Sequence, residues 1–127
     1  MEIGNNFENG TIYGMNGIIQ SEEIPFIPHA KFKGVSLKHL VTGEKTNHQI
    51  SCHLVKVSPF CTLDTHTHEN NLEIHEIIYG NGTFSIADTS FSYQAGSIGI
   101  IPANIEHKVL AGDKGLYILA KFIPALL

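Results

Sequence analysis

Two closely spaced histidines are the residues of this sequence best suited to bind a metal ion. The chain contains eight histidines, and a single threonine separates His66 from His68. In an extended strand, residues i and i+2 project from the same face, about 6.6 Å apart. Both imidazoles can then converge on one ion, with metal–nitrogen bonds of about 2.0–2.1 Å. The alternative is a set of polar interior residues with water between them.

A carboxylate and a third imidazole complete the candidate ligand set. Glu73 follows the histidine pair after a short polar connection, so the next strand can bring its carboxylate against them. The alternative for Glu73 is a salt bridge at the rim. His107 lies further along the chain, after a proline-containing turn. Three neutral imidazoles and one carboxylate suit one divalent transition-metal ion, without selecting among Fe, Mn, Zn, Ni, Co and Cu.

His75 is the candidate catalytic residue. It follows Glu73 by two positions, so strand alternation turns both side chains to the same interior face. This position suits a general acid or base, a hydrogen bond to substrate, or support of a metal ligand from behind. A core histidine with satisfied hydrogen bonds is the alternative. Glu76 points the other way, and we favour a structural role for His53.

Short runs rich in Val, Ile, Leu, Phe and Thr must supply the elements that position these residues. The runs start about every 8–12 residues, which is typical of a β-sandwich or barrel. We expect strands at 11–13, 17–20, 34–42, 48–57, 62–68, 73–79, 82–86, 91–94, 97–101, 105–111 and 115–123. Turn residues predict reversals at 80–82, 87–90 and 111–115, and Pro102 should end the strand before it. The predicted fold class is all-β.

The histidines and glycines together resemble the two sequence motifs of the cupin family. Residues 66–80 resemble the first motif, which reads His-x-His, three or four residues, Glu, six residues and Gly; the matches are His66, His68, Glu73 and Gly80. Residues 96–107 resemble the second motif through Gly96, Pro102 and His107. The resemblance implies a small single-domain, metal-binding cupin. Its fold would be a cupin-type double-stranded β-helix (jelly-roll barrel), with His66, His68, Glu73 and His107 as the metal ligands.

Three positions depart from those motifs. Phe60 stands where the first motif opens with a glycine, and Asn104 stands where the second motif has its turn glycine. Ala111 replaces the asparagine that ends the second motif. Asparagine also tolerates a positive φ, so the change at 104 is mild. None of the three is a metal ligand, and the expected metal centre is unaffected.

Length and composition predict one domain. The chain has 127 residues, 43% of them hydrophobic, and a net charge of −4, which fits a single compact domain spanning 1–127. Within it we expect N-terminal strands or an arm at 1–33, the conserved barrel at 34–123 and an apolar tail at 124–127. The tail would either close the barrel end or dock on a second subunit. We expect a homodimer.

The basic residues exclude two classes of partner. All eight are lysines, and an acidic chain without arginine is a poor nucleic-acid binder. The cluster Lys31, Lys33 and Lys38 is expected to be solvated surface rather than a membrane patch. No apolar run is long enough to span a membrane, the start lacks the features of a secretion signal, and two cysteines make no disulfide framework. We therefore expect a cytoplasmic protein that binds neither nucleic acid nor membrane.

A metal-dependent enzyme acting on a small molecule is the favoured function. A dioxygenase is the leading reaction type, and an isomerase or hydrolase is possible. Because the chain has no arginine to clamp a carboxylate or phosphate, we expect a modestly polar substrate, with Lys56 or Lys121 as a single positive charge. The alternative is a non-catalytic small-molecule sensor or binding module, since the run 73–80 also resembles the sensor domains of arabinose-type transcription regulators. A structural barrel with a vestigial site is the third hypothesis.

Overall fold

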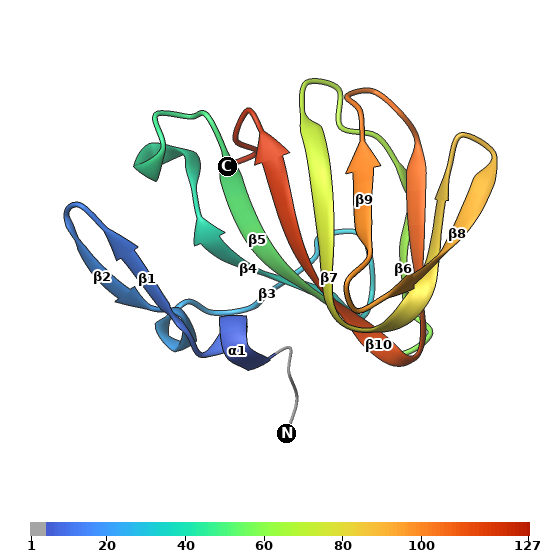
Figure 1. Cartoon of the computed structure of the whole chain (residues 1–127), viewed down its shortest axis with the longest axis horizontal. Helices are drawn as coiled ribbons and strands as arrows, with labels where there is room; N and C mark the ends of the chain where they lie inside the picture. Colours follow the sequence, from blue (N-terminus) through green and yellow to red (C-terminus); the bar gives the residue numbers. More distant parts are fainter. Residues whose placement is uncertain (1–4) are drawn as a thin grey trace.

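The computed structural model describes residues 5–127 and confirms the all-β prediction (Figure 1). One short helix, α1, spans Asn5–Glu8, and two 3₁₀ turns lie at Ser21–Glu23 (η1) and Gly43–Lys45 (η2). The strands are β1 (Thr11–Gly14), β2 (Gly17–Gln20), β3 (Ile27–Pro28), β4 (Val35–Val41), β5 (Ser51–Val57), β6 (Thr62–His66), β7 (Leu72–Ile86), β8 (Thr89–Gln94), β9 (Ile98–Ile101) and β10 (His107–Ile123). The pairings among these strands are antiparallel.

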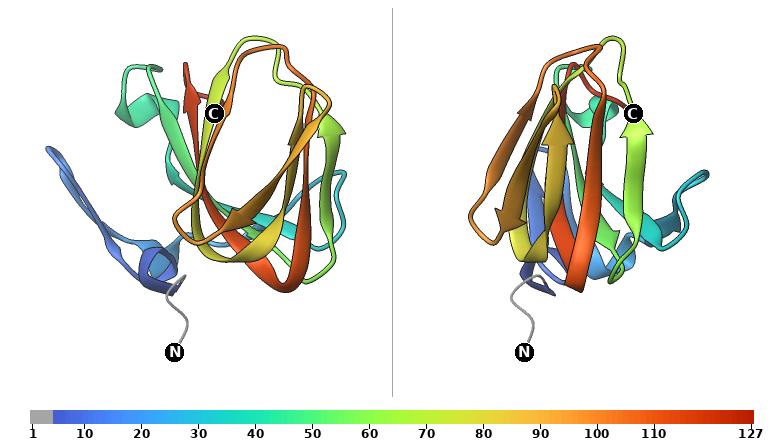
Figure 2. Two further views of the ribbon diagram at one scale, coloured as in Figure 1. Left: turned by 45° about the vertical axis from the view of Figure 1, so that its right-hand side comes forward. Right: turned by 90° about the vertical axis from the view of Figure 1, so that its right-hand side faces the viewer.

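Two long strands form the frame of the barrel. β7 and β10 pair with each other along nearly their whole length, and both bend sharply so that each contributes to two facing walls (Figures 1 and 2). The first half of β7 and the second half of β10 lie with β4, β5 and β9, whereas their other halves lie with β6 and β8. The two walls therefore share a continuous hydrogen-bonded frame.

The reversals predicted at 80–82 and 111–115 were wrong. Both segments lie inside continuous strands, at the bend, where the register between β7 and β10 shifts. Gly80 has a φ of 97°, and a Cβ there would lie 1.9 Å from the carbonyl oxygen of Gly115. Glycine thus permits a positive φ and close contact between two backbones at the bend. The same residue types favour a hairpin when no partner strand runs alongside, and here a partner strand does.

The other predicted turn signals were confirmed. Ala87 and Asp88 connect β7 to β8 with φ values of 49° and 62°, as a two-residue hairpin turn with two positive φ angles requires. β9 ends at Ile101, directly before Pro102. The N-terminal strands predicted at 11–13 and 17–20 form the hairpin β1–β2, which projects from the barrel at the left of Figure 1.

Apolar side chains pack on both faces of the barrel wall. The inner cluster includes Val55, Ile77 and Ile118. The outer cluster contains Leu54 and Leu119, and N-terminal side chains, among them Ile12, Ile24 and Phe26, pack against it. The N-terminal segment therefore covers part of the outer face.

Lys38 was wrongly expected on the solvated surface. Its side chain is buried, and its ammonium donates to the carbonyl oxygens of Ser21 at 2.6 Å and Glu8 at 3.2 Å. Burial of a charge requires such partners, so Lys38 fastens the N-terminal segment to β4. Among residues 5–127, no helix has the length and apolarity needed to cross a membrane.

Candidate metal centre

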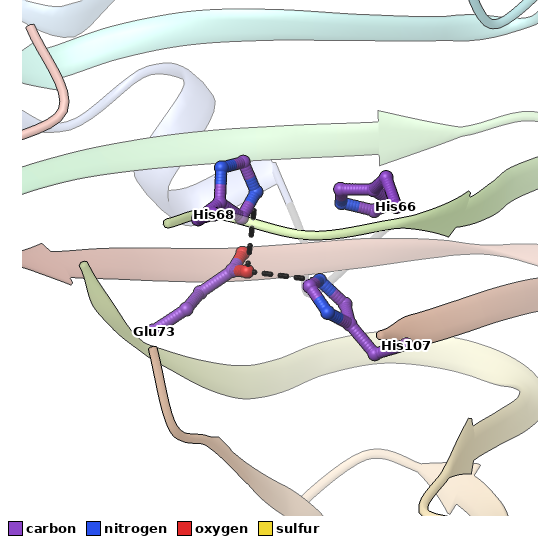
Figure 3. A group of neighbouring side chains, drawn as sticks. All are labelled: His66, His68, Glu73 and His107. Carbon is purple, nitrogen blue, oxygen red and sulfur yellow. Dashed lines mark ion pairs between the residues drawn. The ribbon is translucent and has the colours of Figure 1, made fainter. Parts of the chain in front are cut away.

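The structure brings together the four residues predicted as metal ligands. His66 ends β6, His68 follows two residues later, Glu73 lies at the start of β7, and His107 begins β10. One ligand atom from each lies within 4.8 Å of the others, and Figure 3 shows the side chains turned toward one another. His66 and His107 are direct partners across the β6–β10 pairing. The consecutive strands β6 and β7 and the distant strand β10 therefore deliver the set to one end of the barrel, away from the bend (Figure 1).

The loops that carry the two motifs are hydrogen-bonded to each other. The backbone amide of Asn104 donates to the carbonyl oxygen of His68 at 2.8 Å, and Asn104 has a φ of 66°. This confirms that asparagine takes the positive φ of the motif glycine. Phe60 also adopts a positive φ, 62°, which is uncommon for a bulky residue. The backbone thus keeps the glycine-like conformation at both departures.

Backbone carbonyls fix the orientation of two of the imidazoles. Nδ1 of His66 lies 2.6 Å from the carbonyl oxygen of Asp64, and Nδ1 of His107 lies 3.0 Å from that of Ile105. A carbonyl oxygen only accepts, so each Nδ1 carries the proton. In the neutral imidazoles, Nε2 of His66 and of His107 then has the lone pair, which is the form that binds a metal.

Glu73 is a buried carboxylate at the centre of the group. Its Oε1 lies 3.2 Å from Nε2 of His107 and 3.6 Å from Nε2 of His68. Burial alone would raise its pKa, but His75 and His107 outweigh this effect and hold the pKa of Glu73 below its usual value. The carboxylate is therefore ionised at neutral pH.

Two buried polar atoms at this site have no hydrogen-bond partner among residues 5–127. They are Oε1 of Glu73 and Nε2 of His107, which face each other at 3.2 Å. Leaving buried polar atoms unpaired is costly. A cation between them would accept lone pairs from both, so the residues present fit a metal ion.

Burial also favours the neutral imidazoles that metal binding requires. Burial lowers the pKa of both His66 and His68 from the usual value. For His107, burial acts in the same direction, but Glu73 and the carbonyl oxygen of Ile105 together outweigh burial and raise the pKa. Neutral His66 and His68 are thus available as ligands without the loss of a proton.

His75 lies behind Glu73 rather than among the imidazoles. It is buried, its Nε2 lies 2.9 Å from Oε2 of Glu73, and its Nδ1 lies 2.9 Å from the hydroxyl of Tyr93. The predicted interior orientation is confirmed. Because both ring nitrogens are engaged, the geometry favours support of a ligand among the roles considered for His75. The catalytic role stays a prediction.

Comparison with solved structures identifies the fold. A scan of protein-family models found no match to the sequence, and a search of curated proteins found none. An RmlC-like cupin from Shewanella frigidimarina superposes with a TM-score of 0.73 and 15% identity, covering 85% of this chain and 90% of that one. The chain folds as a cupin.

Two further solved structures superpose on this chain with similar scores. A protein described as a predicted oxalate decarboxylase from Thermotoga maritima has a TM-score of 0.76 and 25% identity, covering 85% of this cupin and 99% of its own chain. KdgF from a Halomonas species has a TM-score of 0.71 and 16% identity, covering 81% of this cupin and 90% of its own chain. These likenesses support the jelly-roll fold predicted from the motifs.

His53, for which a structural role was favoured, lies away from the candidate ligands. His53 is fully buried, with Nδ1 2.8 Å from Nδ1 of His39 and Nε2 2.9 Å from the hydroxyl of Ser51. It lies outside the metal-ligand group. Among the described residues, the structural interpretation of His53 therefore agrees with its contacts.

Neither lysine proposed for substrate lies beside the ligand group. Lys121 forms an ion pair with Glu76. Glu76 lies between the buried residues His75 and Ile77, which agrees with its predicted outward orientation. Lys56 is exposed and lies over the rings of Phe26 and Tyr117 on the outer wall. The prediction of a positive charge from these residues was wrong, because both alternate with inward-facing neighbours.

Sequence reasoning missed Tyr93 and Phe32. Tyr93 contacts His75, and the ring of Phe32 lies 5.5 Å from that of His66 between centroids. Tyr93 stands in a predicted strand, but alternation does not say which of its faces is inward. The position of Phe32 depends on a loop whose course no pattern predicts.

Proposed function

We propose that this cupin binds one divalent transition-metal ion through His66, His68, Glu73 and His107. The observation that carries the proposal is the pair of unpartnered buried atoms, Oε1 of Glu73 and Nε2 of His107, within a group whose ligand atoms lie within 4.8 Å of one another. The oriented lone pairs of His66 and His107 support it. The ligand set does not select one metal among Fe, Mn, Zn, Ni, Co and Cu.

The metal would serve a reaction on a small molecule, and a dioxygenase is the leading type. A bound ion of this kind supplies Lewis-acid or redox chemistry at positions the protein leaves free. The chain's own residues orient the ligands and exclude water around Glu73. No arginine exists to grip a substrate carboxylate, so the substrate class proposed is a small, modestly polar metabolite. Oxalate belongs in the test panel because one matching protein is named for it.

Elemental analysis of purified protein tests the metal site. We expect about one equivalent of a transition metal in the wild type and near-zero occupancy in His68→Ala. His48→Asn is the matched control, because His48 is exposed, has a φ of 61° and lies outside the group. Full metal occupancy in His68→Ala would show that His68 is not a ligand. Absence of metal binding by the wild type would refute the proposal.

Oxygen uptake tests the reaction class. The protein is loaded anaerobically with Fe(II), exposed to O2 and screened with candidate metabolites including oxalate, and product is measured alongside uptake. Substrate-dependent O2 consumption that is lost in His107→Ala supports a dioxygenase. Turnover without O2 supports an isomerase, hydrolase or decarboxylase instead.

A small-molecule sensor or binding module is the second candidate. It is favoured by His75, whose two ring nitrogens are both engaged and so offer no free proton acceptor to a substrate. Stoichiometric metal and saturable ligand binding, with no turnover under any metal, would move the assignment to this function.

We also propose that the functional form is a homodimer in the cytoplasm. Exposed apolar side chains support self-association: Tyr13 and Ile18 of the projecting hairpin are 76% and 64% exposed, and Ile98 of β9 is 65% exposed. Apolar tail residues Leu126 and Leu127 also remain partly exposed. Sedimentation equilibrium should give twice the monomer mass, and a monomer at micromolar concentration would contradict the dimer.

A further inference from the structure

A chain of two hydrogen bonds lies behind the candidate ligand Glu73. Oε2 of Glu73 contacts Nε2 of His75 at 2.9 Å, and Nδ1 of His75 contacts the hydroxyl of Tyr93 at 2.9 Å. The three side chains are 5%, 2% and 3% exposed. We propose that His75 and Tyr93 are positioning residues that hold Glu73 as a ligand through one oxygen, Oε1. This inference rests on the proposed metal site.

The direction of the hydrogen bonds follows from the donors available. An ionised carboxylate only accepts, so Nε2 of His75 must carry the proton that contacts Oε2. In the neutral imidazole, Nδ1 then has the lone pair and accepts from the hydroxyl of Tyr93. The reverse tautomer would place a nitrogen lone pair against a carboxylate lone pair. The carboxylate of Glu73 therefore selects this tautomer of His75, and the hydroxyl of Tyr93 completes the chain by donating to Nδ1.

The two carboxylate oxygens of Glu73 therefore have different surroundings. Oε2 is occupied by the N–H of His75, whereas Oε1 has no hydrogen-bond partner and lies nearest His107 and His68. A carboxylate fixed in this way offers a single oxygen to a cation. The chain of two hydrogen bonds thus limits Glu73 to one coordination position on the metal ion and leaves other coordination positions for substrate.

Three strands hold Tyr93 in place for this contact. Its ring stacks on Phe84 with centroids 4.8 Å apart and an interplanar angle of 8°. Gly99 is the partner of His75 across the β7–β9 pairing, and a Cβ at Gly99 would lie 1.9 Å from the tyrosine hydroxyl oxygen. Gly99 is not among the positive-φ glycines. Its lack of a side chain therefore makes room for the hydroxyl rather than for an unusual backbone.

The competing explanation is a core in which His75 and Tyr93 merely satisfy each other. Both explanations predict a loss of stability when either group is removed, so stability does not separate them. A positioning role also predicts changes at the metal, which a purely structural role does not. The test must therefore measure the metal ion itself.

The first test is Tyr93→Phe, with Tyr13→Phe as the matched control because Tyr13 is exposed on the hairpin. The probe is Co(II) alone, followed by its affinity and its visible absorption spectrum. We expect Tyr93→Phe to weaken Co(II) binding roughly tenfold or more, as outer partners of metal ligands do, and to shift the visible bands. Tyr13→Phe should match the wild type in both.

A second pair of variants keeps the inference falsifiable if Tyr93→Phe does not fold. His75→Ala removes the donor to Oε2, whereas the side-chain amide of His75→Gln can restore it. We expect a loss of roughly tenfold or more in His75→Ala, with most of the affinity and the wild-type spectrum recovered in His75→Gln. Wild-type affinity and spectrum in folded Tyr93→Phe and His75→Ala would overturn the positioning role while leaving the metal site intact. If the wild type binds no Co(II), both the proposed metal site and the positioning role of His75 and Tyr93 are refuted.

Discussion

Two groups of buried and half-buried histidines differ in how their polar atoms are satisfied. In one, His53 contacts His39 and Ser51 at 2.8 and 2.9 Å. Ser51 in turn accepts from the backbone amide of Leu126 at 2.9 Å. In the other, Glu73 and His107 each leave one buried atom without a hydrogen-bond partner. Because unpaired buried atoms are costly in a purely structural core, the second group has the character of a binding site and the first that of a scaffold.

The comparison also shows why residue type alone does not identify a site. Both groups contain at least two histidines in contact, and burial lowers the pKa of His53 and of His66 alike. What distinguishes the ligand group is a carboxylate among the rings and backbone carbonyls that turn lone pairs inward. A metal site thus requires convergence of acceptors, whereas the scaffold pairs each donor with an acceptor.

The largest expected difference is the response of stability to metal. A ligand at 1,000 times its Kd stabilises the native state by about 4 kcal/mol. We expect that increment in the wild type and in His39→Ala, and its complete loss in His107→Ala. Chemical denaturation with and without saturating Zn(II) measures it. An equal increment in His107→Ala would erase the distinction between the two histidine groups.

The next effect is the stability of the metal-free protein. His53→Ala opens a cavity in the inner wall and leaves Ser51 without its histidine partner, so we expect a loss of about 2–4 kcal/mol in the free energy of unfolding. Stoichiometric metal binding should persist. Urea unfolding of the metal-free variant measures the free energy of unfolding, and a metal titration measures the stoichiometry. Wild-type stability in His53→Ala would contradict the structural role of His53.

The smallest expected effect is a pH dependence that belongs to the scaffold. Burial, followed by the neighbouring His39, lowers the pKa of His53 to about 4. Between the ordinary value of about 6.5 and that pKa, the unfolded chain binds more protons, so stability falls as pH falls. Replacing His53 by Gln should flatten the decline of metal-free stability by at most about 1.4 kcal/mol per pH unit. Parallel curves for wild type and His53→Gln from pH 6.5 to 4.5 would show that His53 does not titrate there.

Much of the site was predictable because its information is local. The i, i+2 spacing of His66 and His68 and the same-face placement of Glu73 and His75 need only strand alternation, and the structure places all four as expected. Tyr93 was not predictable, because its contact with His75 depends on the pairing of β8 with β7 and on the space above Gly99.

The sequence by itself determined the all-β class, the candidate ligands and the reversal at 87–90, since each depends on a few neighbouring residues. Tertiary structure decided that the glycines at 80–82 and 112–115 bend paired strands instead of reversing them. It also decided that Lys38 is buried, and that the ring nitrogens of His53 have hydrogen-bond partners whereas Oε1 of Glu73 has none among the described residues. The physical reason is that local patterns set backbone conformation and face, whereas the partner of a buried polar group is set by segments distant in the chain.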